Sequence, residues 1–160
     1  MKKLHLIYAQ YEANESLQHL LSGCPVLKEL EIYLYVDYYH CQISSPTIKR
    51  LIVNLHFHDA EYDNQNYYHM LEINTPALVY LKFVDYSGQH IKCGALTSLI
   101  EADIDICGAK GERKDFLYSR SALEFIDTLH GVKWLKLDLL ARTKICDSVF
   151  STWKGKVSVT

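Results

Sequence analysis

The sequence lacks most of the features that assign a chain to a specialised class. Its 160 residues contain only three prolines, and 17 Lys+Arg nearly balance 19 Asp+Glu at a formal net charge of −2. This balance excludes a polybasic nucleic-acid-binding arm or an acidic disordered tail as the main feature. No apolar run approaches the roughly 20 residues of a membrane span, and the N-terminus lacks the apolar stretch of a signal peptide. We therefore expect no nucleic-acid partner and no membrane partner.

The five cysteines are odd in number, widely spaced and never arranged as CxxC. This pattern favours neither a disulfide framework nor a zinc ribbon. Free thiols in a chain without a signal peptide fit a reducing compartment, so we expect a cytoplasmic or nuclear location. We interpret each cysteine as a small buried hydrophobe. The cysteines are Cys24, Cys41, Cys93, Cys107 and Cys146.

Motifs of catalysis and metal binding are also missing. The chain has no G-x-S-x-G, P-loop or G-x-G-x-x-G sequence. The segment 56–59, His-Phe-His-Asp, offers two histidines on one strand face, but structural zinc almost always takes four ligands. Glu101, Asp103 and Asp105 share a strand face and could bind a cation, although an acidic surface is the favoured interpretation. We predict no catalytic residue, no metal site and no cofactor, and we expect that the chain is not an enzyme.

What the sequence does contain is an internal repeat. The pattern is Pro-x-apolar-x-x-apolar-x-apolar, and all three prolines, Pro25, Pro46 and Pro76, occupy its first position. Two weaker copies without proline begin at Thr97 and His130. The copies follow one another at intervals of 21 to 33 residues, so the repeat is irregular. Self-similarity at such a period is typical of stacked repeat proteins.

The end of each copy predicts a short strand, because apolar residues alternate there with period two. The paired side chains should point inward, and the earlier apolar residue should pack in the turn before the strand. Leu4 and Leu6 resemble the end of a preceding copy, and Val157 and Val159 resemble the start of a further strand. The five inward pairs are Leu30/Ile32, Leu51/Val53, Leu81/Phe83, Ala102/Ile104 and Leu135/Leu137.

The connecting segments vary in character. A helix is predicted over 13–22, capped by Asn14 or Ser16 and ended by Gly23. A second helix is predicted over 121–130, where leucine and isoleucine recur at helical spacing. A further strand is expected at 70–73, and the segment 110–115 has the charge and glycine of a loop.

These observations together predict an α/β leucine-rich-repeat solenoid. Each unit cannot bury its apolar face alone, so stacked units form a parallel sheet over one continuous core. We expect an irregular horseshoe arc with the sheet on its concave side. Short helices and loops should form the convex side.

Four segments resemble the leucine-rich region of plant F-box/LRR proteins, often called F-box/FBD/LRR proteins. The resemblance extends over roughly residues 17–140, and the segments are 20–30, 43–51, 73–81 and 99–106. In that family an F-box docks the Skp-type adaptor of a cullin-type (SCF) ubiquitin ligase, and the repeats capture the protein to be ubiquitinated. The resemblance therefore implies a substrate-recognition module whose partner is a protein substrate of ubiquitination.

The chain departs from the family in having no F-box before Leu4 and no evident complete FBD domain. We therefore expect residues 1–160 to form a single leucine-rich-repeat region of about five or six irregular repeats from a longer protein. A Skp-type adaptor is expected as a partner only if an F-box lies upstream. An alternative is a stand-alone, truncated leucine-rich-repeat binding protein without a ligase role, acting as a competitor or a relic.

Residues that alternate with the inward ones should line the concave surface. One interpretation is that their charges form cross-strand pairs, each of which is worth about 0–1 kcal/mol when exposed. The other is a mixed-charge recognition surface anchored by Tyr80 and Trp134, since aromatic residues dominate protein interfaces. The candidate protein-binding residues are Glu31, Arg50, Ile52, Tyr80, Lys82, Glu101, Asp103, Asp105, Trp134 and Lys136.

Overall fold

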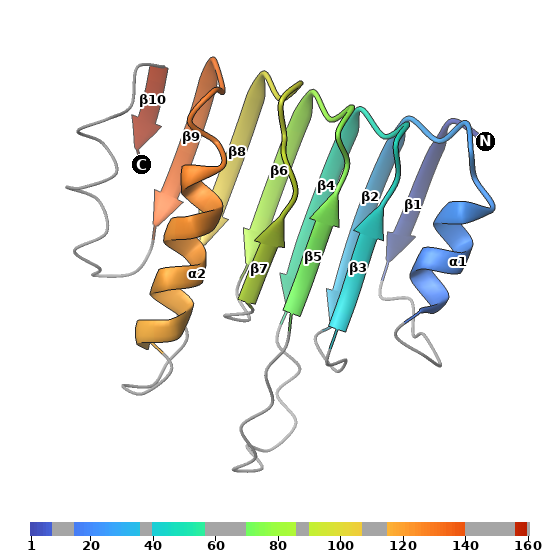
Figure 1. Ribbon diagram of the computed structural model, residues 1–160, viewed down its shortest axis with the longest axis horizontal. Helices are drawn as coiled ribbons and strands as arrows, with labels where there is room; N and C mark the ends of the chain where they lie inside the picture. The colour runs from blue at the N-terminus through green and yellow to red at the C-terminus, as the bar shows by residue number, and fades with distance from the viewer. Residues whose placement is uncertain are drawn as a thin grey trace, which may run out of the picture.

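The computed structural model describes residues 1–7, 15–35, 40–56, 70–85, 90–106, 115–139 and 156–159. The described residues form two layers, and each layer runs the length of the molecule (Figure 1). One layer is a parallel sheet of seven strands, here called sheet A. Its strands, in spatial order, are β1 (Lys3–Ile7), β2 (Glu29–Tyr35), β4 (Arg50–His56), β6 (Tyr80–Asp85), β8 (Glu101–Ile106), β9 (Trp134–Leu139) and β10 (Lys156–Val159).

The second layer contains a three-stranded parallel sheet, here called sheet B, with one helix at each side (Figure 1). Its members, in order across the layer, are α1 (Ser16–Ser22), β3 (His40–Ser44), β5 (Met70–Asn74), β7 (His90–Cys93) and α2 (Asp115–Asp127). From β1 to β9 the chain passes to the second layer and back between successive strands of sheet A, and all neighbouring strands of this sheet are parallel. The chain is therefore an α/β protein dominated by strands.

The register of sheet A places equivalent positions of the repeat side by side. Leu30 pairs with Leu51, Leu51 with Leu81, and Ala102 with Leu135. All five predicted inward pairs lie on the core side of the sheet, and each of their side chains is at most 2% exposed. The earlier apolar residues of the pattern, from Leu27 to Val132, are buried as well. The inward register predicted from the sequence is confirmed.

A short turn precedes four strands of sheet A and accommodates two of the three prolines. In each turn the first residue's carbonyl accepts a backbone hydrogen bond of 3.0–3.1 Å from the fourth residue. Pro25 and Pro76 occupy the second position of this turn, where the fixed φ of proline suits the backbone. The bonds run from Leu27 to Cys24, from Leu78 to Thr75, from Leu99 to Leu96 and from Val132 to Leu129.

The two helices complete the edges of sheet B through single side chains. At one edge, the Gln18 amide donates to the Ser44 carbonyl at 3.2 Å and accepts from the Ser44 N–H at 3.1 Å. At the other edge, the Ser121 hydroxyl accepts from the Ile91 N–H at 2.9 Å and donates to the Ile91 carbonyl at 3.1 Å. At each edge, one side chain thus satisfies a backbone N–H and a carbonyl that a neighbouring strand would otherwise pair with.

The core fills the space between the two layers and is continuous along the molecule. At its α2 end, Phe83 of sheet A packs against Phe125 of the helix, with ring centroids 5.2 Å apart and planes inclined at 57°. Such tilted aromatic pairs add about 0.5–1.5 kcal/mol to the burial of their area. Helix α2 therefore closes the part of the core that sheet B does not reach.

The predicted helices form, but with different boundaries. Helix α1 begins at Ser16, so Ser16 is its first residue and does not cap it. Glu15 precedes it without a side-chain capping bond, and Asn14 lies outside the described residues. Gly23 does end the helix, but at a φ of −73° that any residue can adopt. The Gly23 N–H donates a backbone hydrogen bond of 3.2 Å to the His19 carbonyl.

Helix α2 starts at Asp115, six positions before the predicted start, and ends at Asp127. The expectation that Asp115 belongs to a loop is therefore wrong, while 110–114 lie outside the described residues. The strand predicted at 70–73 is confirmed as β5, and those predicted around Leu4 and Val157 are confirmed as β1 and β10. Strands β3 and β7 are the elements that the sequence reasoning missed.

Candidate functional site: the outer face of sheet A

The candidate site is the side of sheet A that faces away from the core, here called the outer face. All ten predicted binding residues lie there, in three rows that cross the strands. The first row contains Lys3, Glu29, Arg50, Tyr80, Glu101 and Trp134. The second contains His5, Glu31, Ile52, Lys82, Asp103 and Lys136. The third contains Ile7, Tyr33, Asn54, Val84, Asp105 and Asp138.

The first row holds the aromatic residues expected to anchor a partner. The Arg50 guanidinium lies over the Tyr80 ring, with 3.8 Å between the guanidinium carbon and the ring centroid. This cation–π contact holds both side chains in place on the open surface. Trp134, two strands beyond Tyr80, is 52% exposed, which leaves much of a large ring available for contact. Tyr80 and Trp134 are thus brought onto one row, with Glu101 between them.

The second row is dominated by charge. The Lys136 ammonium lies 3.4 Å from an Asp103 oxygen, and His5 lies 3.7 Å from a Glu31 oxygen. These are cross-strand pairs, as one interpretation of the sequence predicted, and at this exposure each is worth about 0–1 kcal/mol. Among the described residues, Lys82 has no partner for an ion pair, and the same is true of Glu101 in the first row. Cross-strand pairing therefore accounts for only part of the charge on the outer face.

The third row is the least exposed. Val84 is buried and Asp105 is half-buried, so this side of the face has little free surface at β6 and β8. Tyr33 donates a hydrogen bond of 3.1 Å to the Glu31 carboxylate, and its ring lies 5.8 Å from that of His5. The accessible part of the face is therefore concentrated in the first two rows.

Histidine and cysteine side chains also lie in sheet B, on the other layer. His40 and Cys41 point to opposite sides of β3, because the His40 ring contacts Glu72 at 3.6 Å whereas Cys41 packs against the core. Burial raises the pKa of Cys41 and that of Cys93 to about 12, so both remain protonated thiols near neutral pH. Within the described ranges, no three His, Cys, Asp or Glu side chains come together in a metal-binding group. Of segment 56–59, only His56 is described.

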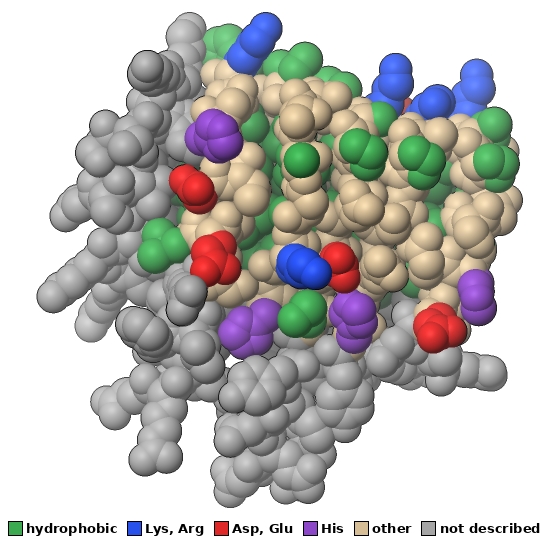
Figure 2. All heavy atoms as spheres, in the orientation of Figure 1, with side chains coloured by type: hydrophobic (Ala, Val, Ile, Leu, Met, Phe, Trp, Pro, Cys, Tyr) green, Lys and Arg blue, Asp and Glu red, His purple; other side chains and the backbone are tan. Residues whose placement is uncertain are grey.

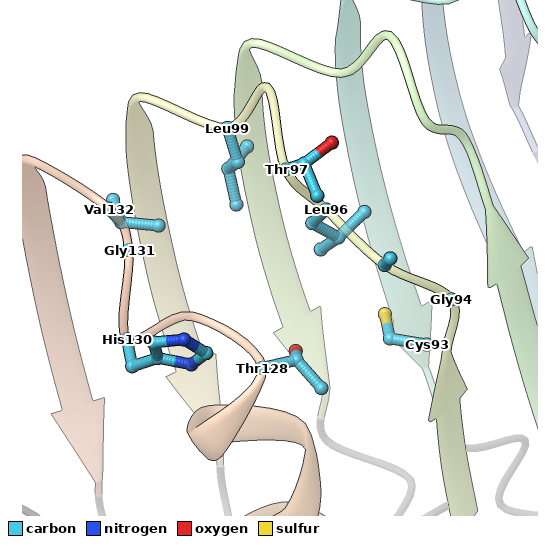
Figure 3. Close-up of a pocket in the computed structure, with 10 residues that line it drawn as sticks. Cys93, Gly94, Leu96, Thr97, Leu99, Thr128, His130, Gly131 and Val132 are labelled. Atoms are coloured by element: carbon cyan, nitrogen blue, oxygen red, sulfur yellow. The ribbon is translucent and has the colours of Figure 1, made fainter.

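A hollow of about 300 Å³ lies where sheet B gives way to α2. Figure 3 shows that Leu96 and Leu99 line it from the turn after β7, and that His130 and Val132 line it from the loop after α2. The lining is mainly apolar, and the Cys93 thiol at the end of β7 is kept protonated by its raised pKa. The repeat pattern does not predict this hollow, because it arises where a helix takes the place of a strand in the second layer.

Comparisons with known proteins agree with a leucine-rich repeat. A family model described as Leucine Rich Repeat matches residues 1–25. An FBD-associated F-box protein of Arabidopsis thaliana is 27% identical across 88% of this chain and 30% of its own length. An F-box/LRR-repeat protein of the same plant is 34% identical across 83% of this chain and 29% of its own. No solved structure gives a significant match.

The fold and these matches indicate the class of the protein: residues 1–25 match a leucine-rich repeat, and the parallel unit recurs along sheet A. The chain is similar over most of its length to part of plant F-box/LRR-repeat and FBD-associated F-box proteins. The chain spans about a third or less of the length of these relatives. No helix among the described residues is long and apolar enough to cross a membrane.

Proposed function

We propose that the chain is a protein-interaction module, a leucine-rich-repeat solenoid arc whose outer face of sheet A binds a protein partner. The observation that carries the proposal is the first row of that face. There the stacked Arg50 and Tyr80, the Glu101 carboxylate and the exposed ring of Trp134 lie on neighbouring strands, and Glu101 forms no ion pair within the described ranges. Tyr, Trp and Arg are the residue types that most often dominate binding energy at protein interfaces.

The geometry of the row also indicates the kind of contact. Tyr80 on β6 and Trp134 on β9 are separated by β8, so their backbones lie about 10 Å apart at the usual strand spacing. A partner that covers both rings also covers Glu101, which lies between them, and reaches Lys82 in the next row. The partner should therefore present an apolar surface that carries a cationic group opposite Glu101 and an anionic group opposite Lys82. Burial of such charges without partners would be unfavourable.

We further propose that the module is the substrate-recognition region of an F-box subunit of an SCF-type ubiquitin ligase. The support is that the relatives are named as F-box proteins. Residues 1–160 would then form one leucine-rich-repeat region of about five or six repeats in a longer chain. Its partners would be a protein substrate of ubiquitination and, through an F-box elsewhere, a Skp-type adaptor, in the cytoplasm or nucleus.

The binding proposal is tested by affinity capture with the 160-residue chain and two variants. Trp134→Ala removes the most exposed anchor of the outer face, while Met70→Ala removes a side chain of similar exposure, 39%, on the opposite layer. We expect proteins captured by the unmodified chain to be retained by Met70→Ala and lost by Trp134→Ala. Equal capture by both variants would show that the outer face is not the binding surface.

The ligase proposal needs a separate experiment on the full-length protein. We expect a Skp-type adaptor to co-purify with it, and the protein captured through Trp134 to accumulate when the gene is disrupted. If Trp134-dependent capture occurs but no adaptor co-purifies, the ligase role is wrong, and the stand-alone binding protein is the better description.

A further inference from the structure

A row of lysines lies along the rim where the strands of sheet A begin. The residue immediately before each strand pairs with its counterpart in the next unit through backbone hydrogen bonds of 2.8–2.9 Å. For example, the Lys28 N–H donates to the Lys2 carbonyl, and the Lys49 N–H donates to the Lys28 carbonyl. The six residues of this rim row, in spatial order, are Lys2, Lys28, Lys49, Val79, Ile100 and Lys133.

The positive charge of the rim row has no counter-charge in the described structure. The ion pairs formed within the described residues involve none of its four lysines. Glu29, the acidic residue next to Lys28 in sequence, is already paired with Lys3 at 3.5 Å. Figure 2 shows Lys and Arg side chains along the top edge of the molecule, whereas most of the Asp and Glu side chains visible on this side lie lower down.

Structural stability does not explain this arrangement. Lys2, Lys28 and Lys49 lie on three neighbouring units about 4.8 Å apart. Like charges directly opposite one another in a sheet are destabilising. The same short turns could carry any polar residue at this position, because only backbone groups take part in the ladder. A ligand that supplies negative charge removes this repulsion.

The rim row also has apolar members in a defined place. Val79 is half-buried, and Ile100 is 41% exposed, so the two offer an apolar contact between Lys49 and Lys133. From Lys2 to Lys133 the row crosses five strand spacings, a length of about 24 Å. An extended peptide covers that length with about seven residues. The order along the rim is three cations, two apolar residues and one cation.

The width of the row indicates which kind of anionic ligand fits. The next row toward the outer face contains Glu29 and Glu101 as well as Lys3 and Arg50, so carboxylates interrupt the positive charge beside the rim row. A membrane presents negative charge over a plane and would also meet these carboxylates. A single extended strand of peptide can follow the rim lysines and meets fewer of these carboxylates than a plane does.

We propose that this rim binds an extended acidic segment of a partner protein, in which aspartate or glutamate residues at both ends flank a central apolar pair. Because side chains alternate along an extended peptide, those that face the rim contact the lysines at both ends, and a central apolar side chain lies on Val79 and Ile100. The rim is a second binding surface, separate from the outer face of sheet A, and it does not depend on the ligase role.

The test uses the full 160-residue chain and a fluorescein-labelled peptide of about seven residues. The peptide has three aspartates, then leucine and valine, then two aspartates, and a matched peptide has asparagine at every aspartate. We expect saturable binding of the acidic peptide, measured by fluorescence anisotropy, and at least ten-fold weaker binding of the asparagine peptide. Binding should weaken as NaCl is raised from about 0.1 M to about 1 M, because the Debye length falls from about 10 Å to about 3 Å.

Three variants locate the binding. Lys49→Gln should raise the Kd about two- to five-fold, as expected for one exposed charge pair, and Lys28→Gln combined with Lys49→Gln about ten-fold. Lys92→Gln removes an exposed lysine from sheet B and should leave the Kd unchanged. Circular dichroism confirms that each variant is folded. Trp134→Ala should also leave the Kd unchanged, so failure of the outer-face proposal is distinguishable from failure of this one.

Two results would overturn the proposal. One is equal affinity of the double lysine variant and the unmodified chain for the acidic peptide. The other is binding to phosphatidylserine vesicles, lost on double substitution, together with no binding to the peptide, since that would assign the rim to a membrane surface.

Discussion

The substitution Ser121→Ala tests how the second layer ends. The Ser121 hydroxyl both accepts from the Ile91 N–H at 2.9 Å and donates to the Ile91 carbonyl at 3.1 Å. Ile91 is 6% exposed and Ser121 is 9% exposed, so water has little access to either group. The alanine variant therefore leaves two buried backbone groups of β7 without partners.

The size and the sign of the effect both follow from this geometry. An unsatisfied buried donor or acceptor costs about 1–3 kcal/mol, so two such groups cost about 2–6 kcal/mol. Alanine is the better helix former in the middle of α2 by about 0.5 kcal/mol, which acts in the opposite direction. The expected net loss in the free energy of unfolding is about 2–5 kcal/mol. If the two hydrogen bonds contributed nothing, the variant would instead be slightly more stable.

The assay is urea unfolding followed by far-ultraviolet circular dichroism, with hydrogen exchange at the Ile91 amide as a local measurement. Ser98→Ala, in an exposed turn, is the matched control and should change stability by less than about 0.5 kcal/mol. Ser121→Ala should lower the urea midpoint and speed exchange at Ile91. An unchanged or raised midpoint would refute the view that side chains from the helices complete sheet B.

Three further predictions concern the core, the thiols and the other sheet edge. Leu81→Ala should cost about 2–5 kcal/mol in urea unfolding, because Leu81 is fully buried; a loss below about 0.5 kcal/mol would contradict the inward register. At pH 8, iodoacetamide should label Cys41 and Cys93 far more slowly in the folded chain than in urea, since burial raises the pKa of each thiol to about 12. Because these thiols ionise near pH 9.0 when unfolded, their contribution to stability is present below pH 9 and is lost as pH rises toward 12; equal labelling rates would contradict their burial. Gln18→Leu should cost about 1–3 kcal/mol in the same urea assay, through two part-buried bonds to Ser44; an unchanged midpoint would mean that α1 does not complete its edge.

The sequence predicted sheet A well because each strand carries its own signal. The position of each proline indicates which residues of the following strand face inward. The observed pairing of Leu30 with Leu51, and of Leu51 with Leu81, follows from that assignment. The same assignment of inward residues predicted that Tyr80, Glu101 and Trp134 lie in one row. Their role in binding stays a prediction.

Sheet B was harder to predict, although a signal was present. Ile43 and Ile73 stand three residues before Pro46 and Pro76 and are fully buried in β3 and β5. The strands have only four or five residues, and their outward side chains are polar apart from Met70, so the alternation is brief. The boundaries of both helices were misplaced because their ends depend on tertiary contacts more than on local capping.

The sequence by itself determined the repeat, the inward register of the strands and the order of the outer-face rows, because alternation with period two is a local property of the chain. Only the tertiary structure decided which charges are paired, how the edges of sheet B are completed and where the four rim lysines lie together. Those features depend on side chains from units 20 or more residues apart, and the irregular length of the connections hides their distances in the linear sequence.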